Sequence, residues 1–228
     1  EVQIVQREVA TDGNALGEFL RDNRSTILQA TPGMWRMLVD AGWQSQGRFK
    51  ALVGGEPLPA DLASELLAGA GEVWNLYGPT ETTVWSTCWR VRPDMVATGR
   101  VSIGTPMANT TVWVVGTEGQ PCPTGVPGEI WIGGTGVTLG YLDREALTAE
   151  RFVSANFPAA QGQRMYRTGD RGRWRSDGLL EHLGRIDFQV KVRGYRIELG
   201  EIEACCNDVQ GVARSVVLAR EDRPGDVR

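Results

Sequence analysis

The sequence predicts an α/β protein: a parallel sheet with flanking helices, then a β-rich subdomain of distorted-barrel type, then the start of a small α+β domain. Two observations support this. Strand-like and helix-like segments alternate over the first 80 residues, which is typical of a parallel sheet covered by helices. From about residue 100, short strand-like segments follow one another between Gly and Pro turns. We therefore expect domains at residues 1–100, 101–186 and 187–228.

Helices and strands are expected in turn through the first part. Asp12 caps the first helix, because the apolar residues behind it recur on one helical face. The Thr31-Pro32 pair begins the second helix and Pro59 the third. The expected strands are a short buried segment at 25–30, the segment 49–53, and the segment that leads into Tyr77.

The strand ends are the first candidates for a ligand site, because ligands of parallel sheets gather at the carboxyl ends of the strands. Three such ends combine small and polar residues: Gln29-Ala30, Val53-Gly54-Gly55-Glu56 and Leu76-Tyr77-Gly78. We expect these segments to line one crevice.

The β-rich part and the end of the chain carry further elements. Asp143 should cap a helix that runs through Arg151, with Ala146 and Leu147 facing inward. Gly194 breaks the alternation of the last strand, which predicts a bend or bulge there. The other expected elements are strands at 111–115, 128–132, 178–183, 188–193 and 212–218, and a helix carrying Ile202, Cys205, Cys206 and Val209. We expect the last forty residues to be the beginning of a domain.

Composition narrows the class of protein. The 228 residues are 41% hydrophobic, enough for a sizeable core, and a net charge of -4 does not favour nucleic acid as a partner. No apolar run reaches transmembrane length and the start carries no signal sequence, so the expected location is the cytoplasm, with no membrane partner. The four cysteines form no C-x-x-C pair and are expected to be reduced thiols.

The single histidine, His182, disfavours a Ser-His or Cys-His nucleophilic enzyme. It lies in an alternating apolar segment, so we expect a surface or packing role for it.

The stretch from Asn75 to Thr83 is the strongest candidate site. Gly78-Pro79 makes a rigid, non-helical corner, Tyr77 can stack on a flat ring, and Thr80 with Glu81 can hold a hard divalent cation. The alternative is a tight surface turn.

Three further stretches are candidates for binding residues. The glycines of 133–141 fit neither nucleotide-binding fingerprint, so we favour a structural role for them. Asp170 follows a glycine turn and can accept hydrogen bonds from a diol such as a ribose, although an Asx turn is the common alternative. Arg185 suits phosphate or ribose oxygens and Lys191 offers a movable charge, although a solvated basic strand would look similar. Together with the corner, these residues describe a site for ATP with magnesium.

The motifs, in their order along the chain, resemble those of adenylate-forming enzymes, and among them the amino-acid-activating adenylation domains of nonribosomal peptide synthetases. The resemblance covers essentially the whole chain. The motifs that carry it are 75–81 (NLYGPTE), 128–134 with 140–142 (GEIWIGG and GYL), 166–170 (YRTGD), and 184–187 with 194–198 (GRID and GYRIE).

The resemblance implies an ATP-dependent ligase. A carboxylate attacks the α-phosphate of ATP, which gives an aminoacyl adenylate and pyrophosphate, and the aminoacyl group then passes to the phosphopantetheine thiol of a carrier protein. Neighbouring synthetase domains and a peptidyl carrier protein are the implied partners, and ATP, Mg²⁺ and phosphopantetheine the implied cofactors.

Residue roles follow from the resemblance by position. Thr80, Glu81 and Lys191 are implied as catalytic residues, with Glu81 on the metal. Asp187 is implied as the hinge between the large and small domains, and Lys191 and Gly194 as part of the loop that faces the carrier arm. The implied nucleotide-binding residues are Gly55, Glu56, Asn75, Tyr77 against adenine, Gly78, Thr80, Asp170 on the ribose and Arg185.

The amino-acid pocket is implied at Gln29, Leu52, Gly54, Leu76, Val84 and Trp85. Bulky groups at Leu52, Leu76 and Trp85 leave little volume, and the pattern resembles that of glycine-activating domains, so glycine is the expected amino acid. A cysteine-type pocket is the nearest rival.

The resemblance also places two of the family's lysines outside residues 1–228: one in an upstream phosphate-binding loop and one near the end of the small domain. We therefore expect this chain alone to adenylate poorly. Two alternatives stay open, an acyl- or aryl-CoA ligase of the same superfamily and a non-catalytic truncated remnant.

Overall fold

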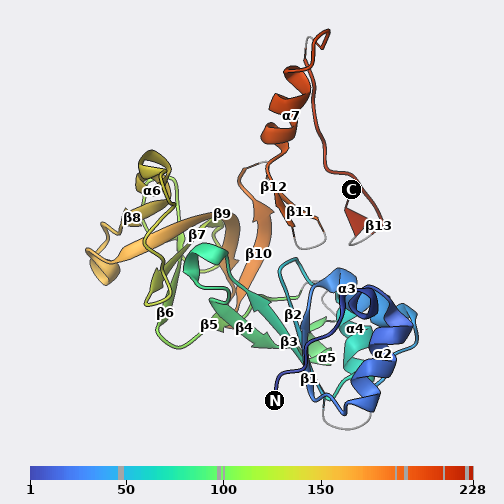
Figure 1. The fold of residues 1–228 in the computed structure, drawn as a ribbon. Coiled ribbons are helices and arrows are strands. Elements are labelled where there is room, and N and C mark those ends of the chain that lie inside the picture. Colours follow the sequence, from blue (N-terminus) through green and yellow to red (C-terminus); the bar gives the residue numbers. More distant parts are fainter. Residues whose placement is uncertain are drawn as a thin grey trace. The chain divides into compact units, whose positions relative to one another are not determined.

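Figure 1 shows the computed structural model of the chain, in which residues 1–45, 49–96, 99, 101–187, 189–192, 195–212, 214–223 and 226–227 are described. The chain forms two compact units. The first unit is Glu1–Asn75 with Arg90–Val101 and Phe188–Arg228, and the second is Leu76–Trp89 with Ser102–Asp187. The domain boundaries at residues 101 and 187 stay predictions.

The first unit confirms the predicted alternation of helices and strands. In chain order its elements up to the end of the third strand are α1 (Arg7–Ala10), α2 (Gly13–Asp22), β1 (Ile27–Ala30), α3 (Pro32–Asp40), β2 (Lys50–Gly54), α4 (Ala60–Gly69) and β3 (Glu72–Tyr77), whose last two residues belong to the second unit. Strands β1 and β2 are parallel, with Gln29 opposite Leu52, and β3 follows β2 in the sheet.

Local signals explain where the helices begin. The Asp12 carboxylate accepts a hydrogen bond from the backbone N–H of Ala15 at 2.9 Å, which satisfies a free donor of the first turn of α2. Thr31 does the same for α3, with Pro32 in the first turn. The sequence predicts the Asp12 cap and the start of a helix at Thr31-Pro32, and both are present.

The predicted burial of β1 is wrong. Of its four residues only Ala30 is buried, and Ile27 is 54% exposed. The reason is that β1 stands at the end of the strand order, paired with β2 alone among the described strands. The buried core of the first unit comes from α2, α3, α4, β2 and β3 and includes Leu16, Trp35, Leu38, Ala51, Val53, Leu62, Leu66 and Val73.

The remaining elements of the first unit are α5 (Pro93–Val96), β11 (Val190–Val192), β12 (Tyr195–Ile197), α7 (Leu199–Asn207), β13 (Glu221–Arg223) and β14 (Asp226–Val227). Strands β11 and β12 are antiparallel, with Lys191 opposite Arg196. The bulge predicted at Gly194 lies outside the described residues.

The strand predicted at 212–218 is wrong, because its described residues adopt no strand. Side chains of α7 take the backbone N–H groups that a strand would have used. The Asn207 amide oxygen accepts the N–H of Ser215 at 2.6 Å, and the Glu203 carboxylate accepts that of Val217 at 2.9 Å.

The second unit is the predicted β-rich part. After the end of β3 it contains the 3₁₀ helix η1 (Thr80–Thr82), β4 (Thr87–Arg90, whose last residue belongs to the first unit), β5 (Thr105–Pro106), β6 (Thr110–Val115), β7 (Gly128–Gly134), α6 (Glu145–Arg151), β8 (Phe152–Ser154), the 3₁₀ helix η2 (Pro158–Ala160), β9 (Arg164–Trp174) and β10 (Leu180–Arg185). Antiparallel strands are arranged in the order β10-β9-β7-β6, and β8 pairs with β9.

Apolar side chains cover both faces of this antiparallel sheet. One cluster consists of Tyr77, Ile103, Val112, Val114, Ile130, Ile132 and Leu180, and the other of Val115, Ala155, Phe157, Ala160 and Met165. Tyr77 is therefore packed into a core as well as placed at a strand end. Its ring is held by burial of apolar surface, so it does not depend on a ligand to keep its position.

Two sequence-based expectations fail in this unit. The sequence predicted a glycine turn at 166–170, but these residues lie within β9, the longest strand at eleven residues. The helix predicted from Asp143 is α6, with Arg144 in the N-cap position, because the backbone of Asp143 is left-handed at φ 54°. Ala146 and Leu147 are exposed rather than inward.

In the part of the chain that the structure describes, none of the helices has the length and apolar character that a membrane span needs.

Candidate functional site

The corner after β3 is closed by backbone contacts. The N–H of Ser86 donates to the carbonyl oxygen of Tyr77 at 2.8 Å, which folds the chain back on itself. A Cβ atom at Gly78 would lie 2.5 Å from the oxygen of Val84 and 2.7 Å from the nitrogen of Ser86. Only glycine fits there, because both neighbours are backbone atoms and cannot rotate away.

The alternative of a mere surface turn does not fit this corner, since Tyr77 and Glu81 are both buried. The backbone is also strained on its far side. Thr83 and Val84 adopt left-handed conformations, with φ of 63° and 71°, which β-branched residues rarely do. Such strain persists only where the surrounding contacts hold it, and it is common at binding sites.

The Glu81 carboxylate is held by a tyrosine from another motif. The Tyr141 hydroxyl donates to Glu81 Oε1 at 2.6 Å and lies 3.3 Å from the hydroxyl of Tyr166. Burial, and then the hydrogen bond to Glu81, raise the pKa of Tyr141 well above its usual value, so the phenol stays a neutral donor. Thr80, at the start of η1, is exposed.

The glycine-rich stretch supports the corner. Thr138 donates its N–H to the Glu81 carbonyl oxygen at 2.9 Å, and Thr83 donates its hydroxyl to the Gly136 oxygen at 2.7 Å. A Cβ at Gly136 would lie 2.8 Å from the Thr82 oxygen. These contacts agree with the structural role predicted for the glycines, and they add that the stretch packs against the candidate site.

Asp170 lies at a bulge in β9. Trp131 is opposite Arg167 and Glu129 is opposite Arg171, so Thr168, Gly169 and Asp170 together face the single residue Ile130. Bulges change the direction in which a side chain points. Here the result is that the Asp170 carboxylate accepts a hydrogen bond from the Tyr77 hydroxyl at 2.6 Å, although the two residues are 93 positions apart.

Polar partners surround the Asp170 carboxylate. His182 Nε2 lies 3.4 Å from Oδ1, and Arg185 Nη1 donates to the same oxygen at 2.9 Å. Burial opposes ionisation of this group, but the hydrogen bonds from His182 and Tyr77 and the charge of Arg185 outweigh it and lower the pKa of Asp170. The carboxylate is therefore ionised near neutral pH.

Arg185 links Asp170 to Asp187. Its Nε and Nη2 donate to Asp187 Oδ1 and Oδ2 at 2.5 and 2.7 Å, which makes a bidentate ion pair. Arg151 Nη2 lies 4.0 Å from Asp187 Oδ2. The residue predicted as the hinge is thus tied to the predicted ribose carboxylate through one guanidinium.

Sequence reasoning missed two residues of this site. The His182 ring lies 5.8 Å from the Tyr77 ring, tilted by 49°, besides its contact with Asp170. It packs, as predicted, but within the candidate site. Its position three residues before Arg185 on the same strand was the available signal. Tyr141 was missed because only the glycines of the stretch 133–141 were considered as candidates for a nucleotide-binding pattern.

The other predicted residues are divided between the two units. Leu76, Val84 and Trp85 belong to the second unit, where Val84 is 55% exposed. Seven belong to the first unit: Gln29, Leu52, Gly54, Gly55, Glu56, Asn75 and Lys191. Within it, Gln29 and Leu52 are neighbours in register, Asn75 is buried and Lys191 lies in β11. Their roles stay predictions.

The donor set limits the kind of metal site. The described residues contain no group of three or more His, Cys, Asp or Glu side chains placed to hold a metal ion. The Glu81 carboxylate is an oxygen donor of the kind that Mg²⁺ takes alongside phosphate and water ligands.

A comparison with protein-family models decides the class. The model described as "AMP-binding enzyme" matches residues 1–142 of the chain, which include the corner, Glu81 and Tyr141. The chain belongs to the AMP-binding enzyme family.

Relatives narrow the type of AMP-binding enzyme. The dimodular nonribosomal peptide synthase of Bacillus subtilis (strain 168) is 44% identical over 228 residues, which is all of this chain and 10% of that protein. Tyrocidine synthase 3 of Brevibacillus parabrevis is 43% identical over 225 residues, 97% of this chain and 3% of that protein. The chain thus spans a tenth or less of these two curated relatives.

A solved structure agrees with these relatives. A four-domain nonribosomal peptide synthetase bound to AMP and glycine superposes with a TM-score of 0.75 at 43% identity, covering 98% of this chain and 17% of that one. The chain therefore belongs to the family of nonribosomal peptide synthetase adenylation domains, as its motifs predicted.

Proposed function

We propose that this chain is the nucleotide-holding part of an adenylation domain that activates an amino acid with ATP and passes it to a carrier protein. The observation that carries the proposal is the meeting of Tyr77, Asp170 and Arg185. An aromatic ring, an ionised carboxylate and a guanidinium in hydrogen-bond contact suit a base, a ribose diol and phosphate oxygens.

The proposed reaction joins two anions. A carboxylate oxygen of the amino acid attacks the α-phosphorus of ATP, the bond from that phosphorus to the bridging oxygen breaks, and pyrophosphate leaves. The protein needs no nucleophile of its own for this step. Its residues position the nucleotide and supply positive charge, which offsets the repulsion between the reacting groups.

Magnesium is proposed at Glu81. Mg²⁺, when bound with ATP, neutralises phosphate charge and orients the leaving group. Glu81 would hold it, with Tyr141 keeping the carboxylate in place through the 2.6 Å hydrogen bond and Thr80 on the phosphates. A single carboxylate suits an ion that draws its remaining ligands from phosphate and water.

Glycine is the proposed amino acid. The similar synthetase structure carries AMP and glycine, and Leu76 and Trp85 in this chain present bulky groups for the small pocket proposed at Gln29, Leu52, Gly54, Leu76, Val84 and Trp85. Pyrophosphate exchange by the complete gene product should depend on glycine more than on cysteine or a carboxylic acid. Exchange with an acyl or aryl acid but no amino acid would instead support the CoA ligase alternative.

We also propose how the aminoacyl group reaches the carrier protein and in which compartment the protein works. Asp187 is the proposed hinge, and Lys191 lies in the segment proposed to face the phosphopantetheine arm. The cytoplasm is the proposed compartment, because ATP is available there and the four cysteines are free thiols.

AMP binding to the 228-residue chain, measured by calorimetry, is the direct test. Wild-type chain should bind AMP, and Asp170→Asn should weaken binding by about tenfold or more, since a charged hydrogen-bond acceptor for the ribose is lost. Asp177→Asn is the matched control, because Asp177 sits in the exposed β9–β10 turn, paired with Arg175. Absence of AMP binding by the wild type would overturn the proposal.

A further inference from the structure

The bulge in β9 leaves three residues of backbone without a regular partner in β7, although Asp170 still pairs with Arg185 of β10. Thr168, Gly169 and Asp170 face Ile130 alone, so their N–H groups cannot all pair with β7. A buried backbone donor without a partner costs free energy comparable to a lost hydrogen bond. The hydrogen bonds that these N–H groups make therefore determine how rigidly the Asp170 carboxylate is held.

Side chains form hydrogen bonds with the backbone groups of the bulge. The Thr168 hydroxyl donates to the Ile130 carbonyl oxygen at 2.7 Å and accepts the Asp170 N–H at 2.9 Å. The Gly169 N–H donates to Glu129 Oε1 at 3.1 Å. The Gly169 carbonyl oxygen accepts the N–H of Ile186, the residue after Arg185, at 2.8 Å.

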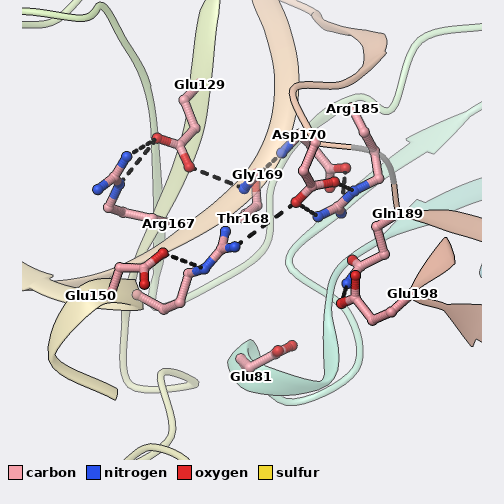
Figure 2. A network of polar contacts seen from close by, with 12 residues as sticks. Glu81, Glu129, Glu150, Arg167, Thr168, Gly169, Asp170, Arg185, Gln189 and Glu198 are labelled. Carbon is pink, nitrogen blue, oxygen red and sulfur yellow. Dashed lines mark hydrogen bonds and ion pairs between the residues drawn. The ribbon is translucent and has the colours of Figure 1, made fainter. Parts of the chain in front are cut away.

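The two oxygens of the Glu129 carboxylate bind different partners (Figure 2). Oε1 holds the Gly169 N–H, while Oε2 accepts Nε and Nη2 of Arg167, both at 3.1 Å, and the indole N–H of Trp131 at 3.0 Å. The Arg167 guanidinium also lies over the Trp131 ring, 5.5 Å from its centre. The side chain of Glu129 is only 12% exposed, so these bonds form largely out of water.

We infer that Glu129 is a positioning residue for nucleotide binding, which acts through the Gly169 N–H on Asp170. This inference rests on the proposed function, in which Asp170 binds the ribose hydroxyls. Arg167 and Trp131 fix the Glu129 carboxylate, Glu129 fixes Gly169, and Gly169 directly precedes the carboxylate that meets the ribose. In this proposal Glu129 acts through Gly169 and does not bind the nucleotide itself.

The conformation of Gly169 explains why its N–H needs the hydrogen bond to Glu129. Its φ is 72°, and a Cβ there would lie 2.8 Å from both Arg185 Nη2 and Asp187 Oδ2. The position therefore requires glycine, the residue with the greatest backbone freedom. A bond from a fixed carboxylate restricts that freedom at the point where the direction of Asp170 is set.

The experiment compares AMP with 2′,3′-dideoxy-AMP, which lacks both ribose hydroxyls, by calorimetry on four forms of the chain. Glu129→Ala should weaken AMP binding about tenfold and leave dideoxy-AMP binding unchanged, so that the preference for ribose nearly disappears. Glu129→Gln keeps an oxygen that accepts the Gly169 N–H and should restore AMP binding to within about threefold of the wild type.

Arg173→Ala is the matched control. Arg173 lies on the same strand and pairs with the buried Glu181 at 2.7 Å, so its loss disturbs an equivalent ion pair without touching Gly169. It should lower stability but leave the preference for AMP over dideoxy-AMP unchanged.

A second readout needs no nucleotide. Hydrogen exchange at the Gly169 amide, followed by NMR, should be about tenfold faster in folded Glu129→Ala and close to wild type in Glu129→Gln. If Glu129→Ala fails to fold, Arg167→Ala, which removes the group that fixes Glu129, takes its place and should also speed exchange at Gly169. An unchanged ribose preference in a folded Glu129→Ala chain that binds AMP would overturn the inference and leave the proposed function standing. Absence of AMP binding by the wild type would overturn both.

Discussion

The Tyr77 side chain serves two purposes that can be separated. Its ring packs with Ile103, Ile130 and Leu180 in one core cluster, and its hydroxyl donates to Asp170 at 2.6 Å. The desolvation of the phenol and the nearby Asp170 charge raise the pKa of Tyr77 well above its usual value, so it remains a donor near neutral pH.

Replacing Tyr77 by Phe should lower the free energy of unfolding by about 1–3 kcal/mol, because a buried hydrogen bond to a charged group is lost. AMP binding should stay within about tenfold of the wild type, since the aromatic face is kept. Tyr77→Ala should lose far more binding. Urea unfolding and calorimetry measure the two effects, and equal loss of binding in both variants would contradict the stacking role.

The lowered pKa of Asp170 predicts how its contribution to stability changes with pH. Because the pKa in the folded chain lies below that of the unfolded chain, about 3.9, the ionised group stabilises the fold above that value. This stabilisation is lost as the pH falls through the folded-state pKa. The difference in free energy of unfolding between wild type and Asp170→Asn should thus be constant from pH 7 to 5 and shrink below pH 4. A difference that grows on acidification would show the opposite shift.

The corner between β3 and η1 depends on one glycine. Gly78→Ala should lower the free energy of unfolding by about 1–3 kcal/mol, because its Cβ would overlap backbone atoms of Val84 and Ser86, which cannot rotate away. Gly200→Ala in α7 is the control, since a Cβ there meets no atom within 4 Å, and alanine should stabilise the helix by about 0.5 kcal/mol. Thermal unfolding followed by circular dichroism distinguishes the two.

The glycine-rich stretch between β7 and α6 carries Tyr141 to Glu81. Tyr141→Phe should raise the Mg²⁺ concentration needed for half-maximal ATP binding by about tenfold, because the carboxylate loses the group that orients it. AMP binding without Mg²⁺ should be unaffected. Tyr195→Phe, at an exposed tyrosine of β12, is the control and should change neither quantity. A shift in AMP binding equal to that in ATP binding would place Tyr141 outside the metal site.

Ligand binding should be visible in the stability of the whole chain. AMP at 100 times its dissociation constant should raise the free energy of unfolding by about 2.7 kcal/mol, since it binds the folded state alone. Dideoxy-AMP at the same concentration should raise the free energy of unfolding less, because it has no ribose hydroxyls to donate hydrogen bonds to Asp170. Calorimetric melting with each nucleotide measures this, and equal stabilisation would contradict the role of Asp170.

Much of the fold follows from local patterns. The caps at Asp12 and Thr31, the proline at the start of α3 and the alternation of apolar residues are short-range signals, and the elements they predict are present. Two of the incorrect predictions depend on contacts outside the segment concerned. The segment 212–218 has strand-like composition, but its N–H groups find acceptors on α7, and β1 is exposed through its place in the sheet order.

Motifs in the sequence were sufficient to identify the family and to select Tyr77, Glu81, Asp170 and Arg185, since each motif is a short run whose residue types have a chemical meaning. Only the tertiary structure decided which of them meet. A sequence pattern contains no record of strand register, and it is the bulge opposite Ile130 that turns Asp170 toward a tyrosine 93 residues earlier. Long-range pairing likewise brought in His182, Tyr141 and Glu129, whose roles depend on partners that lie close in space but far apart along the chain.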